Sequence, residues 1–216
     1  MKAVVFDMDG VLFDTERLCN DGWLKVAEER GIEGMEQISL ECIGRNAADT
    51  KALVLSRLGA DFPYDDFRAE VSAWFWQEIE KYGMPLKEGV TRILPFLQQR
   101  GFRIGLASST KYESVLECLK RADILDYFSV IVTGDMIEHS KPQPDIYLLA
   151  CRKLEVEPYE AYAIEDSPNG IRSAYAAGMK PVMVPDMIRP DAEMEKLSFM
   201  ICKNLPEFIK YLGEQA

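Results

Sequence analysis

Short apolar runs separated by segments with helical spacing restrict the fold of this chain more than any other feature. The runs cover residues 3–6, 102–107, 130–133, 161–164 and 181–184. None of them alternates apolar with polar residues, which is typical of parallel strands buried on both faces. Helical patterns cover the intervening segments 89–100, 111–121 and 144–154. This alternation predicts an α/β fold with a doubly wound, mostly parallel sheet and right-handed crossovers.

Residues 15–82 interrupt the alternation, because this stretch contains no convincing strand. Segments 18–30, 47–58 and 64–81 have amphipathic helical patterns, with glycines and Pro63 between them. A structureless loop of this length would be unusual inside a compact domain. We therefore expect a small all-helical cap domain at 15–82, inserted after the first strand as a lid over its carboxyl end. Residues 1–14 and 83–216 would form the core.

Composition excludes several classes of partner. The net charge of -11 argues against nucleic acid or an anionic membrane as the main partner. No apolar run approaches the roughly 20 residues that a membrane span needs. The five cysteines are widely spaced and form no CxxC pair, which indicates reduced thiols in a cytoplasmic protein.

Two carboxylates follow the first apolar run, in the segment Asp7-Met8-Asp9-Gly10. Like charges this close repel, and burying either of them requires a partner. A hard divalent cation is a suitable partner for carboxylate oxygens. One carboxylate could then act as a nucleophile and the other as a proton carrier. The alternative is an acidic turn that caps a helix.

Three more polar segments follow predicted strands: Ser108-Ser109-Thr110, Lys141-Pro142 and Glu165-Asp166-Ser167. Ligands of open α/β sheets bind at the carboxyl ends of the strands, so we expect all four segments to converge there. The hydroxyls could cradle a phosphate or cap the next helix. The lysine could reach into the site from a stiff proline-flanked mount, or be a solvated charge.

The last of these segments contains two adjacent acids, Glu165 and Asp166. Adjacent side chains point to different sides of an extended chain, so we expect at most one to aim directly at an ion. Asp166 and Ser167 could instead start the helix led by Pro168. The single histidine, His139, makes Ser-His-Asp hydrolysis and multi-histidine metal sites poor candidates. Carboxylate chemistry on a phosphate suits the site better.

Four motifs in this order and spacing resemble those of the haloacid dehalogenase superfamily. They read DxDGVLxDT from position 7, LASST from 106, KPxPD from 141 and EDSPNGIxSAxxAG from 165. The resemblance covers essentially the whole chain. It is to the subgroup with a helical cap after the first strand of a Rossmann-like core, which contains sugar-phosphate phosphatases and beta-phosphoglucomutases.

The resemblance implies a role for each matching residue. Asp7 would be the nucleophile that forms an aspartyl-phosphate, and Asp9 would protonate the leaving oxygen and then activate water. Ser108 and Lys141 would hold the transferring phosphoryl group. The metal would be Mg²⁺, bound by Asp7, the backbone carbonyl of Asp9 and Asp166, with Glu165 either assisting directly or supporting the other ligands without touching the ion. Candidate substrate-binding residues are Gly44, Arg45, Ser109 and Asn169.

The expected function is hydrolysis of a small phosphomonoester, a phosphorylated metabolite such as a sugar phosphate, by a monomer. Dehalogenases lack an acid at the position of Asp9, so its presence favours phosphate esters. The mutases resembled here carry a cap histidine and a cap lysine, which we place by approximate alignment at Cys19 and within 74–76. Both departures weaken the alternative of a beta-phosphoglucomutase. A remote alternative is a non-catalytic phosphate-sensing module.

Overall fold

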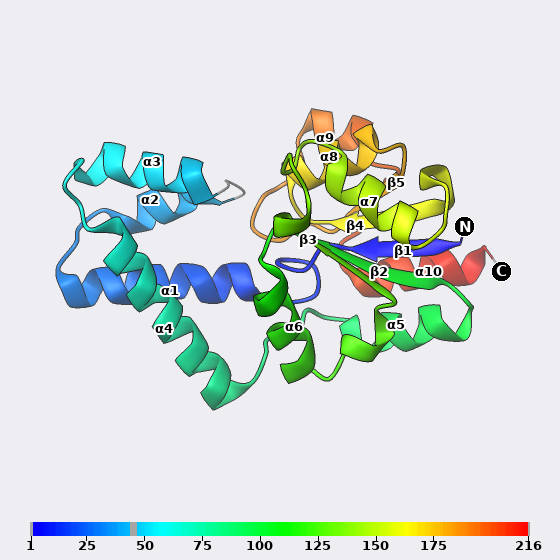
Figure 1. Ribbon diagram of the computed structural model, residues 1–216, viewed down its shortest axis with the longest axis horizontal. Coiled ribbons are helices and arrows are strands. Elements are labelled where there is room, and N and C mark those ends of the chain that lie inside the picture. The colour runs from blue at the N-terminus through cyan, green and yellow to red at the C-terminus, as the bar shows by residue number, and fades with distance from the viewer. Residues whose placement is uncertain (1, 44–46, 216) are drawn as a thin grey trace. The chain divides into compact units, whose positions relative to one another are not determined.

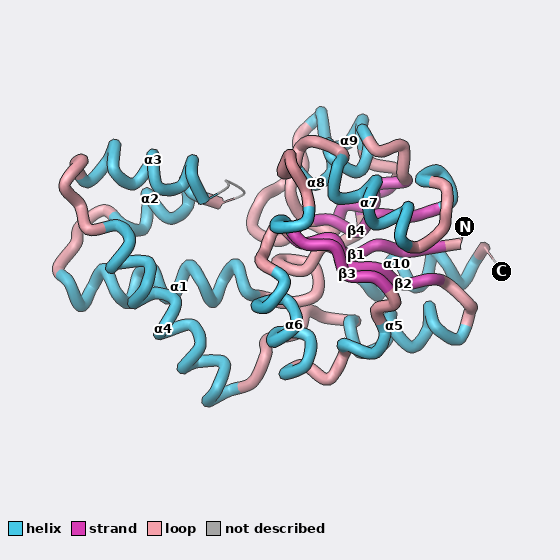
Figure 2. The backbone as a smooth tube through the Cα atoms, in the orientation of Figure 1, coloured by secondary structure: helices cyan, strands magenta, loops and turns pink. Residues whose placement is uncertain are grey.

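A six-stranded parallel sheet is the centre of the computed structural model, which describes residues 2–43 and 47–215 (Figures 1 and 2). Its strand order is β3-β2-β1-β4-β5-β6. The strands are β1 (Ala3–Phe6), β2 (Arg103–Ser108), β3 (Val130–Thr133), β4 (Ala161–Glu165), β5 (Lys180–Met183) and β6 (Met200–Ile201). The predicted doubly wound α/β fold is confirmed. The edge strand β6 was not predicted, because two residues are too short to form a recognisable apolar run.

Helices cover both faces of this sheet (Figure 1). They are α5 (Val90–Gln99), α6 (Tyr112–Arg121), α7 (Asp145–Lys153), α8 (Pro168–Ala176), α9 (Ala192–Leu197) and α10 (Leu205–Glu214). Ile146 and Tyr147 of α7 and Ala174 of α8 pack in one buried cluster with Ala3 and Val5 of β1. The opposite face of the sheet carries α5 and α10. All four residues of β1 are fully buried, as expected for a central parallel strand.

The central position of β1 determines where the site forms. In the sheet register Phe6 pairs with Leu106 of β2 on one side and with Ile164 of β4 on the other. The chain crosses from β1 toward β2 and later back to β4, so the direction of winding reverses at β1. Ligands of open α/β sheets bind at such a reversal, beyond the carboxyl ends of the strands. The residues that follow Phe6, Ser108 and Glu165 therefore meet at one edge.

A second compact unit comprises residues 15–85, and the first comprises residues 1–14 and 86–216. The second unit contains α1 (Thr15–Arg30), α2 (Met35–Cys42), α3 (Ala47–Leu58) and α4 (Tyr64–Tyr82). Its core includes Trp23 and Phe67, whose rings pack edge to face with their centroids 5.4 Å apart. The short helix α2 was not predicted, because its eight residues give only two turns of pattern between Gly34 and the next segment.

The chain leaves and re-enters the first unit at a single paired point. Phe13 forms an antiparallel bridge with Leu86, and the backbone N–H of Lys87 donates to the Leu12 carbonyl at 2.9 Å. The Lys87 ammonium lies 2.7 Å from Oδ1 of Asp186, whose side chain is 1% exposed, and 3.4 Å from Asp14. These contacts join the two ends of the insertion to each other within the first unit.

Candidate active site

Asp7 lies at the carboxyl end of β1, directly beyond the last strand residue. Its backbone N–H donates to the Ile164 carbonyl of β4 at 2.9 Å, so the ladder holds this residue in place. Its side chain is 11% exposed. Burial, with Glu165 and Asp9 nearby, raises the pKa of Asp7 to about 8, although the Lys141 ammonium opposes the rise. A carboxylate in this position therefore needs more positive charge around it than one lysine supplies.

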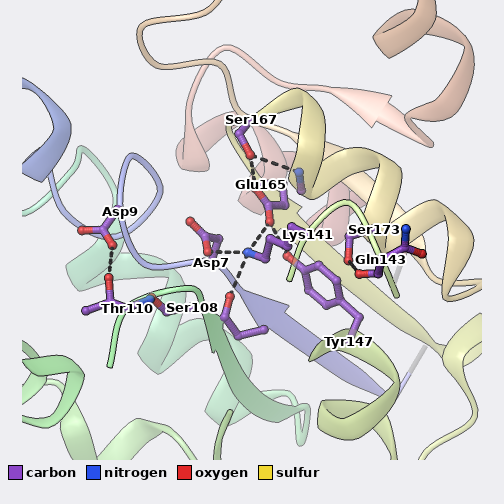
Figure 3. A network of polar contacts seen from close by, with 12 residues as sticks. Asp7, Asp9, Ser108, Thr110, Lys141, Gln143, Tyr147, Glu165, Ser167 and Ser173 are labelled. Atoms are coloured by element: carbon purple, nitrogen blue, oxygen red, sulfur yellow. Dashed lines mark hydrogen bonds and ion pairs between the residues drawn. The ribbon is translucent and has the colours of Figure 1, made fainter. Parts of the chain in front are cut away.

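Lys141 reaches the same edge from the loop before α7 (Figure 3). Its ammonium donates to Asp7 Oδ1 at 2.6 Å, to Glu165 Oε1 at 2.7 Å and to the Ala107 carbonyl at 3.0 Å. Three N–H groups thus meet three acceptors. Burial disfavours the charge, but Asp7 and Glu165 outweigh it and hold the pKa of Lys141 above its usual value. Lys141 is therefore a fixed cation, not a solvated surface charge.

Three buried carboxylates gather at this edge and could hold a metal ion. Asp7, Glu165 and Asp166 each offer an oxygen, and these oxygens lie within 4.8 Å of one another. Glu165 and Asp166 both bring an oxygen to this cluster, whereas the expectation that at most one of them aims directly at an ion stays a prediction. The strand ends at Glu165, so alternation across an extended chain no longer separates the two side chains. An all-oxygen, carboxylate-rich donor set fits Mg²⁺ or another hard cation.

Gly10 allows the Asp7–Asp9 loop to approach this cluster of three carboxylates. It adopts a φ of 78°, and a Cβ at this position would lie 2.4 Å from Asp166 Oδ2. Only glycine accommodates both the left-handed backbone and this close contact. The residue after Asp9 therefore determines how near the loop comes to Asp166.

Asp9 projects its carboxylate to a different group of side chains (Figure 3). The Thr110 hydroxyl donates to Asp9 Oδ2 at 3.0 Å, and the Thr110 backbone N–H donates to Ser108 Oγ at 3.1 Å. The buried Ser108 closes β2 and does not cap α6, whose N-cap is Lys111. The two aspartates of the first motif thus have separate partners, a cation for Asp7 and a hydroxyl for Asp9.

Tyr147 is a member of the network that sequence reasoning missed. Its hydroxyl donates to Glu165 Oε1 at 2.6 Å from the first turns of α7. An aromatic residue at a helical core position normally indicates packing, so the sequence carried no signal of this contact. Ser167 donates to Glu165 Oε2 at 3.2 Å and also caps α8 by accepting from Gly170. The alternative that these residues start the helix is therefore confirmed for Ser167 alone, whereas Asp166 lies with Asp7 and Glu165.

The remaining expected site residues lie outside these contacts. Ser109 is exposed beyond β2. Asn169 lies in the first turn of α8, where its Oδ1 accepts from Arg172 at 3.0 Å. Gly44 and Arg45 lie outside the described residues. The substrate-binding roles of these four residues remain predictions.

The family described as haloacid dehalogenase-like hydrolase matches residues 4–184 of this sequence. The chain belongs to this haloacid dehalogenase-like hydrolase family. It is 34% identical over 184 residues, 84% of either chain, to a phosphorylated carbohydrates phosphatase of Thermotoga maritima. It is 32% identical over 192 residues, 85% of this chain and 83% of the other, to a beta-phosphoglucomutase of Bacillus subtilis. The crystal structure of CbbY from Rhodobacter sphaeroides in complex with phosphate superposes with a TM-score of 0.76, at 26% identity over 96% of both chains.

Membership of this hydrolase family makes the chain an enzyme and argues against a non-catalytic phosphate-sensing module. The described geometry suits a hydrolase of this family. A buried carboxylate next to a fixed ammonium can attack an electrophile, and a second carboxylate held by a hydroxyl can carry a proton. No helix in residues 2–43 and 47–215 is both long and apolar enough to cross a membrane.

Proposed function

We propose that this enzyme is a Mg²⁺-dependent phosphatase that hydrolyses a small phosphomonoester, with a sugar phosphate as the substrate class. The observation that carries the proposal is that the two aspartates have different hydrogen-bond partners. Lys141 holds Asp7 at 2.6 Å, whereas Thr110 holds the Asp9 carboxylate at 3.0 Å. Two carboxylates in different environments suit two different tasks.

In the first half-reaction, an oxygen of the Asp7 carboxylate attacks phosphorus and the ester P–O bond breaks. Asp9 gives its proton to the leaving alkoxide as an alcohol is released. In the second half-reaction, the Asp9 carboxylate takes a proton from water, and the resulting oxygen nucleophile attacks the aspartyl-phosphate. Inorganic phosphate leaves and both carboxyl groups return to their starting states.

Lys141 and Ser108 would bind the transferring phosphoryl group, since phosphoryl transfer depends mainly on positioning and charge neutralisation. Asp7, Asp166 and the Asp9 backbone carbonyl would hold Mg²⁺, with Glu165 assisting. The bound metal would supply positive charge against the carboxylates and the phosphoryl oxygens. Ser109, Asn169, Gly44 and Arg45 would contact the rest of the substrate.

Relatives support the proposed substrate class. Besides the phosphorylated carbohydrates phosphatase, a hexitol phosphatase B of Escherichia coli is 27% identical over 94% of this chain. We accordingly expect phosphates of hexoses, pentoses or hexitols to be better substrates than nucleotides. We place the enzyme in the cytoplasm, because its five cysteines form no disulfide in the described residues, and we propose that it is a monomer. Light scattering after size exclusion would test the monomer.

The decisive experiment measures phosphate release from a panel of sugar phosphates and from p-nitrophenyl phosphate, with Mg²⁺ and with EDTA. We expect Mg²⁺-dependent turnover in the wild type and none in Asp7→Asn or Asp9→Asn. Turnover that is unaffected by EDTA would contradict the proposed metal. Turnover that survives Asp7→Asn would contradict the aspartyl-phosphate.

A beta-phosphoglucomutase is the second candidate, because of the 32% identical relative with that name. The two activities differ in what receives the phosphoryl group, water or a sugar hydroxyl. Incubation with beta-glucose 1-phosphate and a catalytic amount of the bisphosphate separates them. Conversion to glucose 6-phosphate without phosphate release would establish the mutase instead.

A further inference from the structure

Tyr147 contributes a polar group to a part of the core that otherwise requires only apolar packing. Its side chain is fully buried in the cluster formed by α7, α8 and β1. A phenylalanine would fill the same space without burying a hydroxyl, and a buried hydroxyl is unfavourable unless it finds a partner. The hydroxyl donates a hydrogen bond to Glu165 Oε1, at 2.6 Å. The Lys141 ammonium also lies over the ring of Tyr147, with Nζ 5.2 Å from the ring centroid.

Glu165 connects Tyr147 to the candidate active site. It is fully buried, and both of its oxygens accept hydrogen bonds from the protein. Oε1 accepts from Lys141 at 2.7 Å as well as from Tyr147, and Oε2 accepts from Ser167 at 3.2 Å. A Cβ at Gly170 would fall 1.9 Å from the carboxyl carbon, so the packing leaves this carboxylate little room to move. Glu165 is thus fixed from several sides.

We propose that Tyr147 is a positioning residue for the phosphoryl transfer, acting through Glu165 to hold the Lys141 ammonium against Asp7. This inference rests on the proposed function. The contacts run from the Tyr147 hydroxyl to Glu165 Oε1, from there to Lys141 Nζ, and from Nζ to Asp7 Oδ1 (Figure 3). Tyr147 has no exposed surface, so it acts without touching substrate.

Removing the hydroxyl changes how the Lys141 ammonium is shared. Glu165 Oε1 divides its lone pairs between the Tyr147 hydroxyl and Lys141. Without the hydroxyl, the carboxylate is a stronger acceptor for Lys141 alone and draws the ammonium away from Asp7. The nucleophile then loses part of its orientation, whereas the pocket that receives the substrate is unchanged. The expected effect is a lower kcat with little change in KM.

The test compares Tyr147→Phe with a matched control, Tyr162→Phe. Tyr162 is also buried, lies on β4 and shares a side-chain hydrogen bond with Tyr211. Both substitutions remove a buried, hydrogen-bonded hydroxyl and keep the ring. We expect Tyr147→Phe to lower kcat about 10-fold, the scale of supporting-residue effects. KM should stay at the wild-type value, and Tyr162→Phe should keep the wild-type kcat.

A second measurement observes the Lys141 ammonium directly and does not depend on catalytic turnover. In protein with ¹⁵N-labelled lysine, the buried Lys141 ammonium should give a slowly exchanging NMR signal. That signal should exchange faster or broaden in Tyr147→Phe and persist in Tyr162→Phe. If the wild type hydrolyses no phosphate ester, the proposed function fails, while this signal still decides the positioning role.

Three results would overturn the proposal. They are a wild-type kcat in folded Tyr147→Phe, an equal loss in both Phe variants, and an unchanged Lys141 signal. Glu165→Gln is a second variant that keeps the proposal testable if Tyr147→Phe does not fold. It alters the acceptor that Tyr147 and Lys141 share, so a wild-type kcat in Glu165→Gln would also refute the proposed role of Tyr147.

Discussion

The Lys141 ammonium lies 2.6 Å from Asp7 Oδ1, although 134 residues separate the two in the chain. Lys141→Met should lower kcat at least about 100-fold, because the phosphoryl group of the proposed reaction loses its fixed cation. The unfolding free energy should fall by about 3–5 kcal/mol, because two buried carboxylates lose a shared partner. Steady-state kinetics and urea denaturation would measure these effects. Lys153→Met, at an exposed position of α7, is the control and should change neither quantity.

The Thr110 hydroxyl donates to the Asp9 carboxylate, so its removal should most affect the proton transfer that we propose for Asp9. We expect Thr110→Val to lower kcat/KM about 10-fold or more for a sugar phosphate, whose alkoxide needs a proton as it leaves. The loss should be smaller for p-nitrophenyl phosphate, whose leaving group is stable as an anion. Thr110→Ser should retain activity.

Thr133→Val is a matched control, because Thr133 also donates a hydroxyl to an aspartate, Asp135. Thr133→Val should leave kcat/KM unchanged for both substrates. Equal losses for the two substrates in Thr110→Val would mean that Thr110 supports the fold and has no specific part in proton transfer.

Metal binding should release a proton near neutral pH. Burial raises the pKa of Asp7 to about 8 in the metal-free protein, so at about pH 7 this carboxyl holds a proton that a bound cation must displace. At about pH 9.5 Asp7 is already ionised and binding should release no proton. Calorimetric Mg²⁺ titrations in buffers of different ionisation enthalpy would measure the number of protons released.

Asp7→Asn removes the titrating group, so its residual Mg²⁺ binding should release no proton at either pH. Asp166→Asn removes a proposed ligand but keeps Asp7, so it should weaken Mg²⁺ binding, and Mg²⁺ binding should still release the proton. Proton release that persists in Asp7→Asn would assign the titration to another carboxyl group.

Gly10→Ala should specifically disrupt the cluster of Asp7, Glu165 and Asp166. Gly10 and Gly31 both have a left-handed backbone, with φ of 78° and 64°, but a Cβ at Gly31 meets nothing within 4 Å. Each alanine should cost about 1–2 kcal/mol of stability for its backbone conformation. Only Gly10→Ala should also displace Asp166 and weaken Mg²⁺ binding, which calorimetry would detect. Equal Mg²⁺ affinity in the two variants would contradict the close contact.

The sheet and the edge that carries the site were predictable from sequence for one physical reason. Parallel strands buried on both faces leave continuous apolar runs, and β1 and β3 occupy the residues that those runs predicted. Since the carboxyl ends of parallel strands share an edge, the polar segments after them had to meet. Asp7, Lys141 and Asp166 are gathered there as expected.

Side-chain partnerships were not predictable in the same way. The contact between Tyr147 and Glu165 depends on the rotation of α7 about its axis and on its height above the sheet. The joint approach of Glu165 and Asp166 depends on where β4 ends. The height of α7 above the sheet and the last residue of β4 leave no periodic trace in the sequence. Short elements such as α2 and β6 were missed because they contain too few residues to establish a period.

The pairing of Phe13 with Leu86 has a consequence for the history of the chain. Because the inserted helices begin and end at one joined point, their length and sequence can change while the sheet keeps its register. An ancestor could have acquired, lost or replaced such an insertion in a single event, and the carboxylates beyond β1 and β4 would have kept their places. Selection could thus change the insertion without changing the carboxylates at the edge of the sheet.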